Sequence, residues 1–336
     1  MLPDDLNENS SKVVLLTGSG FSKDFGGLLV PDIWMRVYNS DKSNESIRET
    51  LRGVVNDNYE LAISQLKTEE DISLFMDVLG SIFEEFDRII ASSNSVLESI
   101  SKFIEIIKND KKYYFIFSTN QDLLIERTYL HMIQQKMIPG KTLYDIVNFP
   151  CVDFKLSEVL KNTQSNTIES QNNYSFRDFN KIVKLVKDQS NIEGLNYVKL
   201  HGSFNWQHSD DYVIQISGDD KIVKLKSEKL LDLGYELFQK IMLEKNIIVI
   251  VGYGFNDPHI NEQIYSSISQ GSKIVIIMPL KFSLFLNLEF PFSNNPQYKR
   301  IKIIEGVSKY YNCGLLDFIN GQKGYFEDLN KYIKSF

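Results

Sequence analysis

Cysteine is scarce in this sequence, where Cys151 and Cys313 are the only two among 336 residues. Two distant thiols build neither a disulfide framework nor a four-thiolate zinc site, so we expect a reducing, cytoplasmic setting. Long apolar runs are also missing, because the longest, residues 247–251, falls far short of the ~20 residues that span a bilayer. The acidic residues 1–10 do not resemble a secretory signal. Secreted disulfide-rich and membrane-spanning proteins are therefore excluded.

Basic residues are in the minority, with 37 Lys and Arg against 44 Asp and Glu and a net charge of -7. Because tight binding along a phosphate backbone needs a basic surface, we expect no direct nucleic-acid binding. The hydrophobic content of 43% is typical of a globular protein with a sizeable core. The length suits one large domain or two ordinary ones.

Four short runs of mainly β-branched and aromatic residues are the clearest structural signals, at 13–16, 114–117, 247–251 and 274–277. Apolar runs without polar alternation are typical of strands that helices cover on both faces. Each run is followed by Gly, Ser, Asn or Pro and then by helix-like sequence. This order predicts an α/β fold with a Rossmann-like, doubly wound parallel sheet.

The stretch between the first two predicted strands is longer than one crossover helix requires. Apolar residues recur at three- and four-residue intervals through 71–90 and again through 96–107, which predicts two amphipathic helices. We expect a helical insertion over 41–110 within a single domain over 1–336. Residues 155–195 are expected to form a polar loop or second insertion, because their centre is rich in Asn, Gln, Ser and Thr.

Two further segments have recognisable patterns. Residues 212–225 alternate apolar and polar side chains around a Gly-Asp-Asp turn, which predicts a β-hairpin. Residues 325–336 are expected to form a closing amphipathic helix.

The first candidate binding loop, Gly18-Ser19-Gly20-Phe21-Ser22, follows the first predicted strand. A strand that runs through Gly-x-Gly into a helix exposes N–H groups to a pyrophosphate, because glycine has no Cβ to block the approach. A tight turn without a ligand would look the same. Lys23 replaces the third glycine of the dehydrogenase fingerprint, and no acidic strand end follows about twenty positions later, so hydride transfer is disfavoured. Gly140-Lys141-Thr142 lacks the leading glycine of an ATP-binding P-loop.

Two loops carry side chains suited to catalysis. Ser118-Thr119-Asn120-Gln121-Asp122 ends the second predicted strand, where doubly wound folds bind ligands, although its polar residues would also suit a turn and helix cap. His201 follows a short apolar run and precedes a glycine, which predicts a loop position. Imidazole titrates near neutrality and suits a general base, but a lone histidine is more often structural. Weaker signals come from His131 on a predicted helix, His208 in a polar turn and His259 in the first turn of a predicted helix.

A second glycine loop, Gly252-Tyr253-Gly254, follows the predicted strand at 247–251. Asp257 and Pro258 are suited to the N-cap and first turn of the next helix. Two such loops on one sheet indicate a dinucleotide rather than a mononucleotide.

In this order the four loops resemble the sirtuin family, and they look most like the prokaryotic sirtuin-like proteins that consume NAD+ in antiphage defence. The matched motifs extend over 13–260, and we expect strands near 273–278 and 300–306 to complete the sheet. The NAD+-binding residues that the resemblance implies are Gly18, Ser19, Gly20, Ser22, Thr119, Gly252 and Gly254. The catalytic residues that it implies are Asn120, Asp122 and His201.

Departures from the sirtuin pattern narrow the implied function. Protein-deacylating sirtuins hold zinc with four cysteines, which this chain lacks, so no metal is expected. Thr119 replaces the sirtuin glutamine and removes one wall of the acyl-lysine channel. The resemblance therefore implies an NAD+ glycohydrolase that depletes NAD+ in abortive infection, with cyclisation as a side branch. The alternatives are a regulatory subunit that binds NAD+ or ADP-ribose without turnover and, last, a protein deacylase.

The resemblance also implies an assembly. Similar proteins form homo-oligomers, and their partners or triggers include a hexameric ATPase, a short Argonaute and phage components. The predicted insertions at 41–110 and 155–195 are candidate assembly surfaces or lids, because of their expected place around the edge of the sheet.

Overall fold

The computed structural model describes residues 12–54, 58–108, 113–135, 137, 194–204 and 229–335. Its centre is one parallel sheet of six strands in the order β3-β2-β1-β4-β5-β6, which is the Rossmann order. The strands are β1 (Lys12–Thr17), β2 (Tyr113–Ser118), β3 (Gly194–Lys199), β4 (Asn246–Val251), β5 (Lys273–Ile277) and β6 (Val307–Tyr311). The predicted doubly wound fold is confirmed.

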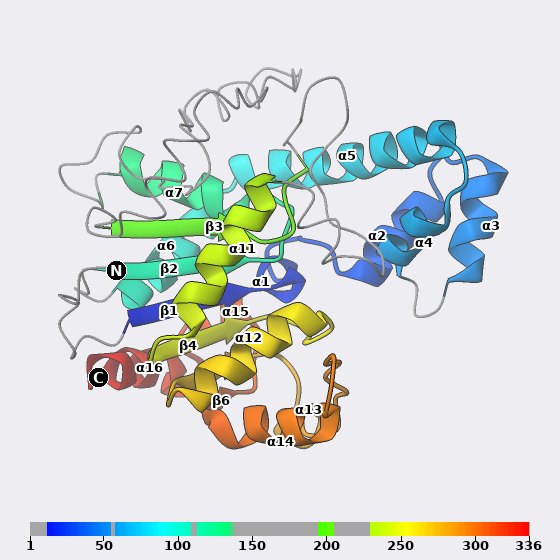
Figure 1. Ribbon diagram of the computed structural model, residues 1–336. Helices are drawn as coiled ribbons and strands as arrows, with labels where there is room; N and C mark the ends of the chain where they lie inside the picture. The colour runs from blue at the N-terminus through cyan, green and yellow to red at the C-terminus, as the bar shows by residue number, and fades with distance from the viewer. Residues whose placement is uncertain are drawn as a thin grey trace.

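Helices cover both faces of the sheet (Figure 1). One layer contains α6 (Asn94–Lys108), α7 (Leu124–Gln134), α15 (Leu315–Ile319) and α16 (Tyr325–Lys334). The other contains α11 (Lys229–Met242), α12 (Pro258–Ser269) and α14 (Pro296–Gly306), with the short α13 (Phe282–Phe285) beside α14. Because the two layers exclude water from both faces, the inner strands consist of continuous apolar runs, and residues 247–250 of β4 are completely buried. No helix within the described ranges is both long and apolar enough to cross a bilayer.

A second group of helices lies beyond the carboxyl ends of the strands (Figure 1). It contains α2 (Val30–Tyr38), α3 (Glu45–Gly53), α4 (Tyr59–Gln65) and the long α5 (Glu69–Ala91), preceded by the short α1 (Ser19–Lys23). We call α2, α3, α4 and residues 69–83 of α5 the helical wall. The wall has a hydrophobic cluster of its own, whereas Phe86 and Ile90, near the end of α5, belong to the cluster around the sheet. The helical wall is therefore a separately packed body that α5 connects to the sheet.

The predicted helical stripes are found in α5 and α6, and the predicted closing helix is α16. The periodicity at 71–90 also includes Ile72 and Ile89, but these side chains are 37% and 50% exposed. The single domain and its insertions at 41–110 and 155–195 stay predictions. Most of the second insertion, the predicted hairpin at 212–225 and the predicted turn with His208 lie outside the described residues.

The strand predicted near 300–306 is wrong, because these residues form the end of α14 and the last strand begins at Val307. Pro296 occupies the first turn of α14, where its fixed φ and missing N–H are tolerated. Gly306 is the last residue of the helix. The β-branched residues before Gly306 suggested a strand, but the helix start signal at Asn295 and Pro296 determines the local structure.

Candidate functional site

The four predicted loops leave the sheet at the same level. Thr17, the last residue of β1, pairs with Ser118 of β2 and with Val251 of β4. Ser118 in turn pairs with Lys199, the last residue of β3. The loops that follow these four residues therefore start side by side at the carboxyl edge, on both sides of the point between β1 and β4 where the strand order reverses.

The two glycine loops pack directly against each other. The Gly18 N–H donates to the Val251 carbonyl at 3.1 Å, and the Gly20 N–H donates to the Gly252 carbonyl at 3.0 Å. A Cβ on Gly252 would lie 2.2 Å from the carbonyl carbon of Gly20, and its φ of +62° is in the left-handed region. Gly20 and Gly252 are therefore required for contact between the loops, which differs from the ligand approach that we expected from the sequence.

A cavity of about 590 Å³ opens at this edge, within the range of about 300–1,000 Å³ typical of ligand pockets. All four loops contribute to its lining. The predicted site residues that line it are Gly18, Ser19, Thr119, Asn120, Asp122, His201 and Gly254. The other three, Gly20, Ser22 and Gly252, are not part of the lining. The structure thus brings seven of the ten predicted residues to one cavity.

Ser22 lies behind the cavity and connects two of its side chains. Its hydroxyl donates to Oδ2 of Asp122 at 2.7 Å and accepts from Nδ2 of Asn120 at 3.1 Å. Oδ1 of Asp122 accepts from the Leu124 N–H at 3.0 Å, so the carboxylate also caps the start of α7. Burial raises the pKa of Asp122, although nearby Lys199 and these hydrogen bonds oppose the rise. Asp122 therefore both caps the start of α7 and contributes to the cavity, so the two interpretations from the sequence are compatible.

The amide orientation of Asn120 follows from this network. The single hydroxyl proton of Ser22 goes to the Asp122 carboxylate, so Ser22 can only accept from Asn120, which must present its NH2 group. Oδ1 of Asn120 is buried and has no hydrogen-bond partner. Oε1 of Gln121, which also lines the cavity, is buried and unpartnered as well. Unsatisfied buried oxygens are uncommon and mark a place where a ligand can donate.

A buried lysine fastens two of the loops together. Lys199 is 1% exposed, and its Nζ forms an ion pair with Oε1 of Glu126 at 2.8 Å. The same Nζ donates to the carbonyls of Gln121 and Asp122 and to the Ser203 hydroxyl. Burial raises the pKa of Glu126, and Lys199 opposes the rise. Sequence reasoning missed this pair, although a lysine next to apolar Val198 and Leu200 was a signal.

His201 lies on the loop after β3, as predicted, but it is not alone. Its Nε2 lies 3.3 Å from Nε2 of His259, and the two rings are 2% and 3% exposed. His259 occupies the first turn of α12, as predicted, and also lines the cavity. His259 was only a weak signal because it was expected in the first turn of a helix, and no local pattern connects it with His201, 58 positions earlier.

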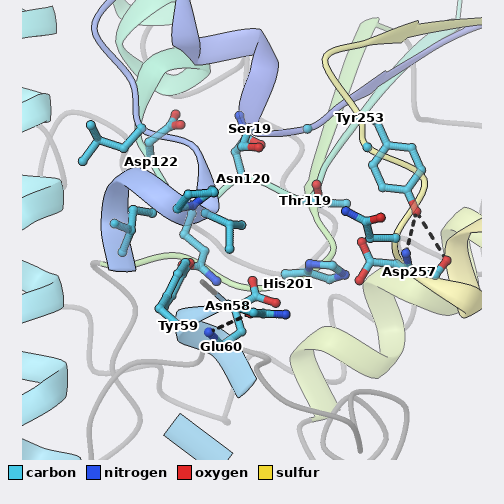
Figure 2. Close-up of a pocket in the computed structure, with 18 of the residues that line it drawn as sticks. Ser19, Asn58, Tyr59, Glu60, Thr119, Asn120, Asp122, His201, Tyr253 and Asp257 are labelled. Atoms are coloured by element: carbon cyan, nitrogen blue, oxygen red, sulfur yellow. Dashed lines mark hydrogen bonds between the residues drawn. The ribbon is translucent and has the colours of Figure 1, made fainter. Parts of the chain in front are cut away.

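The helical wall supplies the remaining side of the cavity. Figure 2 shows Asn58, Tyr59 and Glu60, from the start of α4, on one side of Asn120 and His201. The Asn58 side chain caps α4 by accepting from the Glu60 N–H at 3.0 Å. Asn58, Tyr59 and Glu60 were not singled out in the sequence, because the helical periodicity that favoured core packing over a ligand groove begins later, at residue 71.

The cavity has acidic side chains in its lining, without basic Lys or Arg side chains among the described residues. Three carboxylates line it, from Glu60, Asp122 and Asp257. Among the described residues that line it there is no lysine or arginine. Such a lining favours a ligand with a positively charged group, because desolvation strengthens its attraction to the carboxylates.

The model of the SIR2-like domain family matches residues 115–286. Solved structures with similarity include a mutant Sir2 homologue with ADP-ribose, at 10% identity over 97% of this chain and 93% of that chain, with a TM-score of 0.45. A Sir2 homologue with NAD matches at 9% identity over 97% and 90% of the two chains, with a TM-score of 0.39. No curated protein matches the chain.

Proposed function

Because the chain belongs to the SIR2-like domain family, we propose that it is an NAD+ glycohydrolase that cleaves NAD+ to nicotinamide and ADP-ribose. One observation carries the proposal: Asn120 and Asp122 of one loop and His201 of another line one cavity together with the first glycine turn. Doubly wound sheets bind nucleotides at this place, where the strand order reverses.

The chemistry requires little from the protein beyond orientation and charge. The bond between C1′ of the ribose and the nicotinamide nitrogen breaks through an oxocarbenium-like transition state. Its electron pair leaves with nicotinamide, which becomes neutral and needs no strong acid. Water then bonds to C1′ and gives up a proton. The site must hold the ribose, stabilise its positive charge and accept that proton.

The acidic lining suits the charge that this reaction involves. NAD+ carries its positive charge on the nicotinamide ring, and the charge moves to the ribose in the transition state. In the proposed complex the Asp122 carboxyl group, which is held by Ser22 and by the Leu124 N–H, would lie next to this charge. In our proposal it stabilises the developing charge or holds the carboxamide of nicotinamide.

Asn120 and His201 would orient and activate the nucleophile. The Asn120 amide is fixed by Ser22, and its unpartnered Oδ1 would accept a hydrogen bond from the water or from a ribose hydroxyl. His201 would be the base toward the same water or hydroxyl. The backbone at Gly18 and Ser19, which line the cavity, would contact the phosphates.

We also propose that the activity serves antiphage defence through NAD+ depletion, in a homo-oligomer that a partner ATPase, an Argonaute or a phage component activates. This part rests on the resemblance of the motifs to prokaryotic sirtuin-like proteins. Comparing NAD+ levels in infected cells that carry the wild type or Asn120→Ala tests it, because only the wild type is expected to deplete NAD+.

The test of the enzyme uses the full chain, NAD+ and chromatographic detection of nicotinamide. Asn120→Ala and His201→Ala are each expected to lower turnover by about a hundredfold or more if the side chains act in the transition state. Asn287→Ala, an exposed asparagine outside the cavity lining, is the control and is expected to keep full activity.

The outcomes separate the two main candidates. If the wild type binds NAD+ in calorimetry but releases no nicotinamide, with candidate activators present, the chain is a regulatory subunit that senses NAD+ or ADP-ribose. If nicotinamide appears only when an acyl-lysine peptide is added, the chain is a deacylase.

A further inference from the structure

Two histidines from different parts of the chain meet at the cavity. Their Nε2 atoms are 3.3 Å apart, and the ring centroids of His201 and His259 are 5.4 Å apart, with 40° between the ring planes. Both side chains line the cavity and are almost completely buried. The contact therefore joins two groups of a kind that titrates near neutrality, out of contact with bulk water.

Only one proton can lie between the two Nε2 atoms. A hydrogen bond between them requires one Nε2 to donate and the other to accept, so each ring restricts the tautomer of the other. When the pair carries one positive charge, the donor is an imidazolium and the bond is charge-assisted. A second positive charge would place two N–H groups face to face and break the bond. The two rings are thus expected to bind protons as a unit.

The position of His259 is set independently of His201. The Tyr235 hydroxyl donates to the His259 carbonyl at 3.0 Å, and its ring lies 5.6 Å from the imidazole of His259. The described ionisable groups that line the cavity around the pair are Tyr59, Glu60, Asp122, Tyr253 and Asp257. Lys199 ends the strand before His201, and Tyr235 lies on α11, which packs against α12. The lining itself is acidic, which stabilises the single positive charge that the pair acquires when it accepts a proton.

We propose that His259 is a positioning residue that shares one proton with His201 and holds its ring in one tautomer. The kinetic consequence rests on the proposed function. In that reaction the water oxygen bonds to C1′, nicotinamide leaves with the electron pair of the broken bond, and His201 accepts the proton of the water. The proton between the two Nε2 atoms then lets both rings carry the added positive charge until a proton passes to solvent. His259 sets the pH range in which His201 acts as a base.

The pair is tested first without NAD+, by NMR titration of the full chain labelled with 15N-histidine. In His259→Gln the titration midpoint of His201 is expected to move by about one pH unit or more, because its coupled partner is gone. His131→Gln is the matched control, since His131 is also buried but lies on α7 outside the cavity lining. If His259→Gln does not fold, His259→Asn replaces it. An unchanged His201 titration in the folded variant overturns the proposal.

The second readout is NAD+ turnover over about pH 5 to 9, the range in which imidazole changes charge. His259→Gln is expected to lower kcat by about tenfold or more and to shift the pH profile, while KM changes by less than about threefold. A wild-type pH profile and kcat in His259→Gln would contradict a positioning role. If the wild type does not turn over NAD+, the proposed function fails, whereas the NMR titration still decides whether the rings share a proton.

Discussion

The two sides of the cavity are built in different ways. The sheet-edge loops, residues 17–22, 118–123, 199–204 and 251–257, are joined to one another by backbone hydrogen bonds, the Ser22 network and buried Lys199. The helical wall has a hydrophobic cluster of its own, to which the loops contribute only Leu123 and Phe204. Phe204 stacks on Phe83 with ring centroids 5.5 Å apart.

A buried ion pair adds to the connection between the wall and the sheet. The guanidinium of Arg127, on α7, pairs with the Asp87 carboxylate, on α5. The catalytic side chains at the sheet edge thus depend on many contacts among the four loops. The helical wall, in contrast, lines the cavity but makes few contacts with those loops. Changes in the loops are therefore expected to affect folding and kcat, and changes in the wall to affect mainly ligand affinity.

The largest effect is expected for Lys199→Met. It leaves the Glu126 carboxylate buried without its cation and removes the donor shared by the Gln121 and Asp122 carbonyls and the Ser203 hydroxyl, so the free energy of unfolding should fall by about 3–5 kcal/mol. Urea denaturation measures the loss. Lys309→Met, which breaks a half-exposed pair with Asp328, is expected to lose less than about 1 kcal/mol. Equal losses in the two variants would remove the claim that Lys199 fastens the loops.

The next effect is expected for Gly252→Ala. A Cβ there meets the backbone of the first glycine loop at 2.2 Å and has an unfavourable φ, so we expect a loss of about 2–4 kcal/mol and of NAD+ turnover. Gly271→Ala is the matched control, because its φ is +89° but no atom lies within 4 Å of the added Cβ. The difference between the thermal midpoints of the two variants isolates the clash between the loops. No difference would show that the loops move apart easily.

A smaller effect is expected on the wall side, for Glu60→Gln. Removing one of three carboxylates should weaken NAD+ binding by about two- to fivefold, while affinity for ADP-ribose, which lacks the cationic ring, stays the same. Calorimetry with both ligands measures this, and Glu49→Gln, an exposed residue of α3, serves as the control. Equal weakening for both ligands would mean that Glu60 does not face the nicotinamide.

The smallest effect concerns pH and the internal stability of the wall. Hydrogen bonds from Asn44 and Ser46 lower the pKa of Asp71, which joins α3 to α5. A lowered carboxyl pKa contributes stability above its ordinary value near 3.8, and this contribution is lost as the pH falls through the lowered pKa. Asp71→Ala should therefore be less stable than the wild type at neutral pH, and the gap should narrow in acid. A gap in urea midpoints that is independent of pH would contradict this.

The fold was predictable where one physical requirement dominated. Residues 247–251 are apolar because β4 is buried on both faces. This continuous apolar run allowed the parallel sheet to be predicted from the sequence. The edge strand β6 was misplaced, because Lys309 and its neighbours are only half buried and carry little apolar signal. Helix α14, in contrast, had a clear start at Pro296 that outweighs its β-branched residues.

The candidate site was predictable to the extent that it depends on loops that follow strands. Asn120, Asp122 and His201 stand directly beyond strand ends, and parallel register brings them to one edge. The partners of these residues depend on tertiary packing: His259 meets His201 through the placement of α12, and Glu60 reaches the cavity through the helical wall. No local pattern encodes such contacts, so they had to be seen in three dimensions.

The most direct test of the central claim is a crystal structure of the His201→Ala variant soaked with NAD+. We predict that the dinucleotide lies across the carboxyl edge of the sheet, with the nicotinamide ribose beside Asn120 and the phosphates at the Gly18-Ser19 turn. NAD+ bound elsewhere on the molecule, or a cavity that stays empty at saturating NAD+, would contradict the account.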